Sequence, residues 1–398
     1  MLVVAAEGSP PNPDRAESEL RAAPGFPPVP GSLVFSLRAA AALRPVASIH
    51  YRRALDAPLR AEPGGERMTV NVGVIGAGIM GADHVRTLHR SVSGAAVAMV
   101  ADLDAGRAAA SAAPAGARAT ADARAVIADP AVDAVVIASH DATHADLAIA
   151  ALRAGKPVLC EKPLAPTVAE CRRVAAAEAE AVAAGRPPVA VGFMRRFDPG
   201  YRELKAALQA GACGIPLLAH CVSRGVRSGP GTTDESMVVN SVVHELDLVP
   251  WLLEAPIVEV SRHAARPSPA AGGLEDPQIV LLRTADGVLT TVEAFQNARY
   301  GYDIRCEVVG DRGAIALAPG ARIVRDADLT RSTGHAADWR PRFADAYRIE
   351  LQAWVHSVLA GEPTPLATGR DGVAASAVAE AVITSMHEGG RVSKVELP

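Results

Sequence analysis

Hydrophobic and polar positions along residues 68–193 alternate between two periods. Short apolar runs have the length and β-branched content of buried strands: TVNVGVI (69–75), AAVAMVAD (95–102), VDAVVIAS (132–139), PVLCEKP (157–163) and PVAVGFM (188–194). Longer Ala-rich stretches, such as 142–154 and 167–184, are typical of helices and lie between these runs. This alternation predicts an α/β domain built on a doubly wound parallel sheet.

The strand–helix alternation stops near residue 194. Apolar runs with turn signals between them then follow, at 215–223, 277–284, 287–296, 303–310 and 313–318. Such runs are typical of an antiparallel sheet. We therefore expect an α+β domain over 194–370 with a large, mostly antiparallel sheet. A helix-like stretch at about 371–388 opens a C-terminal segment, 371–398, that we expect to pack back on the first domain.

The first 67 residues have a different composition. They carry Pro-rich pieces such as GSPPNPD and PGFPPVPG, and no sustained helix or strand period, so we expect them to stay outside the fold. A short apolar piece at 32–47 is interrupted by Arg38 and Arg44 and is too short for a membrane span. A start of translation at Met68, which would make 1–67 a mis-assigned leader, is the other interpretation.

Composition narrows the class of partner. The chain has 398 residues, 49% of them hydrophobic, and a net charge of −4, which gives no sign of a nucleic-acid binder. A small-molecule partner fits better, and no membrane partner is expected. The five cysteines form no C-x-x-C pair and are odd in number, which disfavours a disulfide framework or a zinc site and fits a reducing cytoplasm.

A glycine turn follows the first predicted strand. Gly76, Gly78 and Gly81 match G-x-G-x-x-G, with Ile79 and Met80 inside it, in the strand–turn–helix context that a dinucleotide-binding loop requires. The following helix N-terminus would face the phosphates. Asp102 ends the second strand, where a carboxylate binds ribose hydroxyls and repels a 2′-phosphate. The expected cofactor is therefore NAD rather than NADP.

Two further stretches carry candidate chemistry. Lys162, in EKPL after the fifth strand, lies where ligands gather in open α/β sheets, although a lone lysine there is commonly a surface residue. In NSVVHELDLVPWLL (240–253), Asn240, His244 and Asp247 recur at i, i+4 and i+7 on one predicted helical face. That stripe either faces solvent behind an N-cap Asn240 or lines a pocket.

Several motifs together resemble the glucose-fructose oxidoreductase and inositol dehydrogenase family over nearly all of residues 68–398. They are GVIGAGIMG, AGKPVLCEKPL, GFMRRFDPGY and VVHELDLVPWLL, and residues 274–315 look most like the inositol 2-dehydrogenases. The resemblance implies a Rossmann domain that binds NAD, an α+β domain whose sheet mediates a homo-oligomer, a tetramer in relatives, and a polyol substrate between the domains. It implies oxidation of a secondary alcohol, with myo-inositol to 2-keto-myo-inositol the leading reaction in inositol catabolism.

The resemblance also implies roles for individual residues. His244 would be the base that takes the hydroxyl proton, and Lys162 would steady the reacting oxygen. Ser139, His140, Glu161 and Lys162 would join the glycine turn and Asp102 as cofactor contacts. The matching substrate positions are Met194, Asn240, Ser241, His244 and Tyr302.

Two positions depart from the family pattern. Relatives carry an Asp four residues before the histidine, where this chain has Asn240, whose amide oxygen can still accept from the ring but holds no charge. We expect a weaker base and a lower rate or a higher substrate optimum. Relatives also place a polyol-binding Asn where this chain has Gly225. Another inositol isomer or a sugar therefore stays open as the substrate.

Three alternatives remain at this point. His140 and His144 have the spacing of a metal pair, but no further ligands accompany them, so no metal is expected. Arg195 and Arg196 would bind an anionic substrate or form structural ion pairs. Finally, a non-catalytic regulator that binds NAD could use the same scaffold.

Overall fold

The computed structural model describes residues 69–318 and 323–397, all of which belong to the unit Glu66–Pro398. The predicted leader, 1–67, and the proposed start at Met68 lie outside the described residues. Within the described part of the chain, none of the helices is both long enough and apolar enough to cross a membrane.

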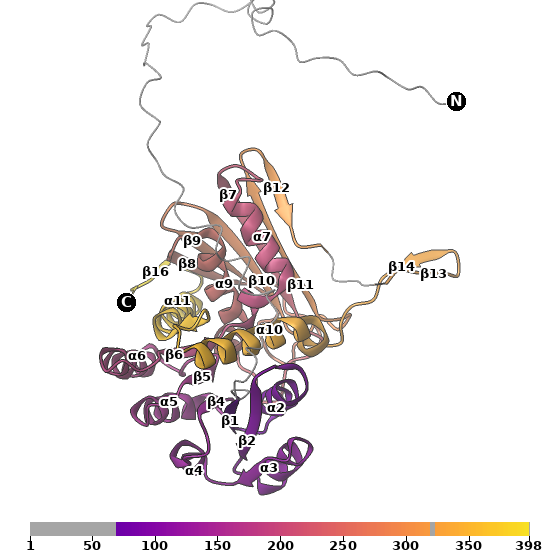
Figure 1. Ribbon diagram of the computed structural model, residues 1–398. Coiled ribbons are helices and arrows are strands. Elements are labelled where there is room, and N and C mark those ends of the chain that lie inside the picture. Colours follow the sequence, from indigo (N-terminus) through magenta and orange to yellow (C-terminus); the bar gives the residue numbers. More distant parts are fainter. Residues whose placement is uncertain (1–68, 319–322, 398) are drawn as a thin grey trace, which may run out of the picture. The chain divides into compact units, whose positions relative to one another are not determined.

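The first sheet has 7 strands in the order β15-β6-β5-β4-β1-β2-β3, and all pairs except β15–β6 are parallel (Figure 1). Its strands are β1 (Val70–Ile75), β2 (Ala95–Ala101), β3 (Arg118–Thr120), β4 (Ala134–Ile137), β5 (Val158–Glu161), β6 (Val189–Gly192) and β15 (Ala367–Thr368). The connecting helices are α2 (Ile79–Ser91), α3 (Ala105–Ala112), α4 (Ala123–Ala128), α5 (His144–Arg153) and α6 (Val168–Ala183). The prediction of a doubly wound parallel sheet is confirmed, and its strand order reverses between β1 and β4, where such sheets bind ligands.

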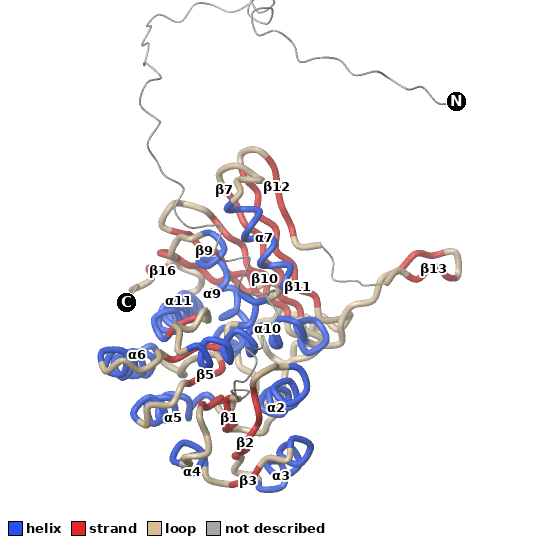
Figure 2. The backbone as a smooth tube through the Cα atoms, in the orientation of Figure 1, coloured by secondary structure: helices blue, strands red, loops and turns tan. Residues whose placement is uncertain are grey.

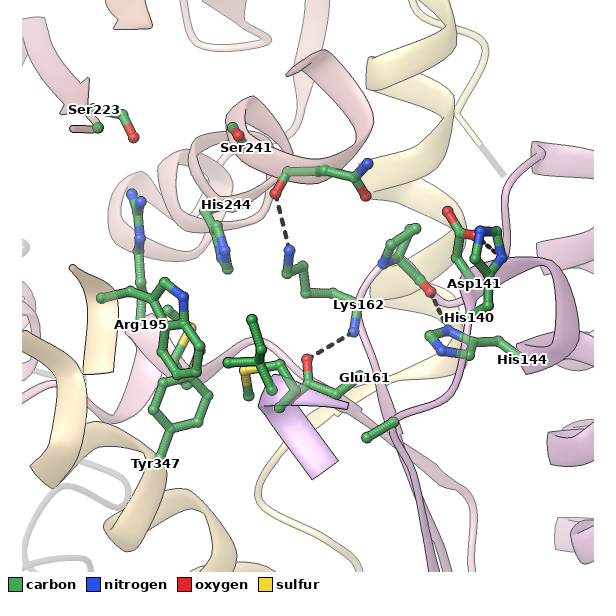
Figure 3. Close-up of a pocket in the computed structure, with 18 of the residues that line it drawn as sticks. His140, Asp141, His144, Glu161, Lys162, Arg195, Ser223, Ser241, His244 and Tyr347 are labelled. Carbon is green, nitrogen blue, oxygen red and sulfur yellow. Dashed lines mark hydrogen bonds and ion pairs between the residues drawn. The ribbon is translucent and has the colours of Figure 1, made fainter. Parts of the chain in front are cut away.

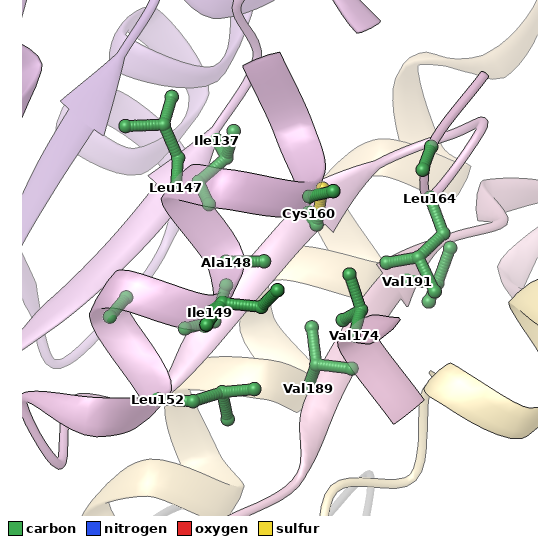
Figure 4. Close-up of a cluster of buried hydrophobic side chains, with 14 of the residues drawn as sticks. Ile137, Leu147, Ala148, Ile149, Leu152, Cys160, Leu164, Val174, Val189 and Val191 are labelled. Carbon is green, nitrogen blue, oxygen red and sulfur yellow. The ribbon is translucent and has the colours of Figure 1, made fainter. Parts of the chain in front are cut away.

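The core of this sheet explains its apolar strand runs. Strands β4, β5 and β6 are buried at every position, because helices cover both faces. Figure 4 shows side chains of β4, β5 and β6 meeting those of α5 and α6. Residues 367–368 join this sheet by pairing with β6, although sequence patterning had placed them in the second domain's range.

The second sheet has 7 strands in the order β12-β11-β7-β10-β9-β8-β16 (Figure 2). They are β7 (Pro216–Arg224), β8 (Ile257–Ala264), β9 (Gln278–Thr284), β10 (Leu289–Phe295), β11 (Asp303–Gly310), β12 (Gly313–Ala316) and β16 (Ser393–Lys394). Only β7 and β10 pair in parallel, so the predicted, mostly antiparallel sheet is confirmed. A separate hairpin joins β13 (Arg325–Ala327) and β14 (Thr330–Ser332).

Helices from residue 199 onward pack against one face of this second sheet, and some of them also contact helices of the first sheet. They are α7 (Pro199–Gln209), α8 (Asp234–Met237), α9 (Val243–Leu253), α10 (Trp339–Ala360) and α11 (Gly369–His387). The buried face of β9 and β10 packs against α9 and α11 in one apolar cluster. Helix α11 also contacts α6 of the first sheet, and α10 contacts α2. These helices hold the carboxyl ends of β4 and β5 close to α9.

Candidate active site

The glycine turn between β1 and α2 has the shape that a dinucleotide requires. Gly76 has φ +94°, and a Cβ on it would lie 2.5 Å from the Ala138 carbonyl oxygen. A Cβ on Gly81 would lie 1.7 Å from the Gly76 carbonyl oxygen, so both positions need glycine. Beside Gly78 there is open space, and no side chain caps the α2 N-terminus. The free backbone N–H groups and the open space fit the pyrophosphate of NAD.

Asp102 follows β2 directly and is held rigidly. Its Oδ2 accepts from the Ala77 backbone N at 2.8 Å, and its Oδ1 accepts from Arg107 Nη2 at 2.7 Å and from Asp104 N at 2.8 Å. Burial opposes ionisation, but these hydrogen bonds prevail and lower the pKa of Asp102. A fixed, ionised carboxylate at this position fits the adenosine ribose hydroxyls of NAD.

The EKP turn after β5 presents Lys162 to the pocket (Figure 3). Glu161 is buried, with Oε1 2.7 Å from His84 Nε2 and Oε2 accepting from the Lys162 backbone N at 3.2 Å. Lys162 Nζ donates to the main-chain oxygen of Asn240 at 2.9 Å. Burial lowers the pKa of Lys162, against the opposing charge of Glu161. The turn thus fixes an ammonium group whose proton is easier to release than that of an exposed lysine.

The stretch 240–253 is not one regular helix. Thr233 is the N-cap of α8, which passes through a π-helical turn, Val238–Val242, into α9. Asn240 is therefore not an N-cap, and it lines the pocket together with Ser241 and His244. The expected single stripe is wrong for Asp247, which is buried against Arg196. The π-turn, with its i→i+5 bonds, changes the angular position of Asn240 relative to His244 and Asp247, which both lie in α9. Asp247 instead accepts from Arg196 Nε at 2.9 Å.

His244 enters the pocket as a neutral ring. Burial, and then the charges of Lys162 and Arg195, lower the pKa of His244 well below its ordinary value. Its Nδ1 has no hydrogen-bond partner among the described residues. The expectation that Asn240 orients the ring through its amide is therefore not met, since Asn240 bonds Lys162 through its main chain instead. A neutral imidazole can accept a proton, and packing rather than a hydrogen bond sets its orientation.

Arg195 and Arg196 form structural ion pairs. The Arg195 guanidinium bonds Glu245, with side chains that are 2% and 1% exposed, and burial raises the pKa of Glu245. Arg196 Nε donates to Asp247 Oδ2 at 2.9 Å, and burial raises the pKa of Asp247 to about 6. Arg195 reaches the pocket wall, but its charge is already balanced. This arrangement disfavours an anionic substrate.

His140 and His144 have separate roles. His144 is buried, with Nδ1 2.8 Å from the Pro163 carbonyl oxygen and Nε2 3.0 Å from that of Ser139, so it links the turns after β4 and β5. His140 is exposed beside Asp141. Across residues 69–318 and 323–397, no three metal-ligating side chains are grouped to hold an ion.

These elements enclose a cavity of about 510 Å³ at the carboxyl ends of the parallel strands. It brings together most of the residues that the sequence singled out: Ile79, Met80, Ser139, His140, Glu161, Lys162, Met194, Asn240, Ser241, His244 and Tyr302. Gly76, Gly78, Gly81 and Asp102 lie outside its lining. Sequence reasoning missed Ser223, Gln296, Trp339 and Tyr347 in the wall. The apolar spacing of Phe343, Tyr347, Leu351 and Trp354 could have revealed α10 and, with it, two of these residues.

Comparison with known proteins agrees with this geometry. Residues 70–184 match the model of an oxidoreductase family described as an NAD-binding Rossmann fold, and residues 230–397 match the C-terminal alpha/beta domain of the same family. Inositol 2-dehydrogenase 2 of Paenarthrobacter aurescens is 54% identical, over 82% of this chain and 99% of the relative. Inositol 2-dehydrogenase 1 of Saccharopolyspora erythraea is 51% identical, over 83% and 97%.

A solved structure has the same architecture. Myo-inositol dehydrogenase from Lactobacillus casei, in complex with NAD(H) and myo-inositol, superposes with a TM-score of 0.79 at 30% identity, covering 83% of this chain and 98% of that one. Both domain models, these relatives and the glycine turn agree. The chain belongs to the glucose-fructose oxidoreductase and inositol dehydrogenase family of NAD-dependent oxidoreductases.

Proposed function

We propose that this enzyme oxidises a secondary alcohol of a polyol, with myo-inositol converted to 2-keto-myo-inositol as the leading reaction. The observation that carries the proposal is the meeting of Lys162 and His244 in one polar cavity, at the carboxyl ends of the strands that bind NAD. The names of the relatives supply the substrate class.

His244 is the proposed base. Because burial and neighbouring cations lower its pKa, the ring is neutral at neutral pH and free to accept the hydroxyl proton. Lys162 is the proposed partner of the reacting oxygen, since its ammonium donates hydrogen bonds and balances developing negative charge. NAD, when bound, supplies the acceptor for the hydride that leaves the same carbon.

The cofactor would be held by several parts of the first sheet. Gly76, Gly78 and Gly81 admit the pyrophosphate, and Asp102 binds the adenosine ribose. Ile79, Met80, Ser139, His140 and Glu161 line the same cavity as Lys162, which supports their proposed role as further cofactor contacts.

A neutral polyol fits the lining better than an anion or an apolar alcohol. Asn240, Ser241, Gln296 and Tyr302 offer uncharged donors and acceptors, Met194 offers an apolar surface, and the nearby arginines are paired. Because Asn240 and Gly225 depart from the family pattern, another inositol isomer or a sugar is the second candidate.

Location and assembly complete the proposal. All five cysteines are free and buried, as suits a reducing cytoplasm, where the enzyme would act in inositol catabolism. We further propose a homo-oligomer, a tetramer by resemblance, formed through the second sheet. The face opposite α9 and α11 carries half-buried apolar side chains such as Val222, Ile279 and Leu281.

The test is NADH formation, followed by absorbance, with NAD or NADP against a panel of inositols and aldoses. The proposal predicts turnover with NAD and an inositol. Clear NAD binding without turnover of any compound would favour the non-catalytic regulator and contradict the proposed enzyme.

A further inference from the structure

Gly225 leaves a gap in the pocket wall that another residue fills. It follows β7, where its N donates to the Phe295 carbonyl at 2.8 Å and its carbonyl accepts from Ala298 N at 3.0 Å. A Cβ on Gly225 would lie 3.0 Å from the Gln296 main-chain oxygen and 3.2 Å from Gln296 Oε1. The Gln296 amide therefore occupies the space that a side chain at 225 would take.

The backbone around Gln296 is firmly held. Its N donates to Asp276 Oδ1 at 2.8 Å, and the next residue, Asn297, donates twice to Asp276 Oδ2, from N at 2.9 Å and from Nδ2 at 2.8 Å. Ser228 N in turn donates to Asn297 Oδ1 at 3.1 Å. Asp276 itself is fully buried. These bonds tie the ends of β7 and β10 together and fix where the Gln296 side chain starts.

The amide at the end of that side chain is available to a ligand. Gln296 lines the cavity, and its side chain has no hydrogen-bond partner among the described residues. An amide offers one acceptor oxygen and two N–H donors, which suits adjacent hydroxyl groups of a polyol. Gln296 is only half-buried, so a polyol hydroxyl would take over a hydrogen bond that the amide can otherwise make with solvent.

We propose that the Gln296 amide is a specificity-determining contact for the polyol and that it takes the place of a side chain at position 225. This inference rests on the proposed function. The contact comes from the β10 end, whereas Lys162 and His244 come from β5 and α9. The Gln296 amide would contact a hydroxyl that does not react, so it would bind the polyol equally in the ground state and the transition state. Its loss should therefore raise KM more than it lowers kcat.

The first experiment replaces the amide by a side chain of similar length. Gln296→Met is expected to raise KM for myo-inositol about tenfold, with kcat and KM for NAD close to wild type, because one hydroxyl contact is lost. The ratio of kcat/KM among myo-, scyllo- and D-chiro-inositol should flatten. Gln209→Met is the matched control, because Gln209 is an exposed α7 residue whose amide bonds Glu254, outside the cavity.

The second experiment removes the amide from position 296 and places one at position 225. Gly225 has no left-handed φ, so a side chain there meets no backbone strain. Gln296→Ala removes the contact with Oε1, while the main-chain oxygen of residue 296 stays 3.0 Å from the new Cβ and has to shift by a few tenths of an ångström. Gly225→Asn combined with Gln296→Ala should recover much of the affinity that Gln296→Ala alone loses. A thermal melt of each variant separates lost contacts from lost folding.

The results distinguish failure of this inference from failure of the proposed function. An unchanged KM for every inositol in Gln296→Met, or an equal rise in KM for NAD, would overturn the inference while leaving the proposed reaction intact. A wild-type enzyme that forms no NADH with any inositol would instead remove the proposed function and this inference together.

Discussion

Lys162 Nζ donates a hydrogen bond to the main-chain carbonyl of Asn240 across 78 positions of sequence. This bond joins the EKP turn to the π-helical turn that precedes α9. It places the ammonium on the same side of the cavity as His244, while the Asn240 side chain adds no charge to either group. Two cations, Lys162 and Arg195, thus act on the histidine, and of the two only Arg195 forms an ion pair with a carboxylate.

The Asn240→Asp variant should change the pH dependence of catalysis. A carboxylate at 240 favours the protonated forms of both His244 and Lys162, so it raises both pKa values. Since His244 must be neutral to accept a proton, the acidic limb of kcat/KM, which lies well below the ordinary histidine range in wild type, should move to higher pH. Loss of the Lys162 proton removes the proposed partner of the reacting oxygen and so sets an alkaline limb, which should move to higher pH as well.

A pH profile of kcat/KM with saturating NAD measures this shift, and Asn240→Ala serves as the control that removes the amide without adding charge. If Asn240→Asp left both kcat and the pH profile unchanged, His244 would not be the base whose pKa depends on the charge at position 240.

Cofactor choice should depend on the Asp102–Arg107 pair. The guanidinium bonds the carboxylate that we propose binds the ribose, so Asp102→Ser would both remove the repulsion of a 2′-phosphate and free Arg107 to bind one. We expect kcat/KM for NADP to rise by roughly 10–100-fold, as for a charge-assisted contact. The gain should vanish in Asp102→Ser with Arg107→Ala; a gain of equal size in both variants would show that Arg107 plays no part.

The Arg195–Glu245 pair should be a major stabilising contact. Both side chains are almost fully buried, so Glu245→Ala leaves an unpaired guanidinium in the interior. Loss of one partner of such a pair costs about 3–5 kcal/mol of unfolding free energy. Chemical denaturation of the variants measures it. Arg195→Met with Glu245→Leu removes both charges and should recover most of the loss, and a double variant no better than Glu245→Ala would contradict this reason.

Local sequence patterns were sufficient for the parts of the site that depend on one turn. Gly76, Gly78 and Gly81 lie in a single strand–turn–helix, so their spacing alone predicts the turn. Lys162 directly follows a buried strand whose end is visible in the sequence. Asp247 does not line the pocket, because it pairs with Arg196, 51 positions earlier in the chain, and no local pattern reveals that partner.

Other parts depend on pairing between distant segments. Gln296 reaches the pocket only because β10 lies parallel to β7, and Trp339 arrives on a helix that follows the β13–β14 hairpin. Neither position can be derived from nearby residues. The resemblance to a family supplied the roles of Lys162 and His244, which chemistry alone would have left open.

The most direct test of the central claim compares wild type with Lys162→Met and His244→Asn in NADH formation from NAD and myo-inositol, alongside NADH binding measured by fluorescence. If His244 is the base and Lys162 the partner of the reacting oxygen, wild type turns over, kcat falls by about 10²–10⁴-fold in each variant, and cofactor binding is retained. Variants that oxidise myo-inositol at close to the wild-type rate would contradict these roles.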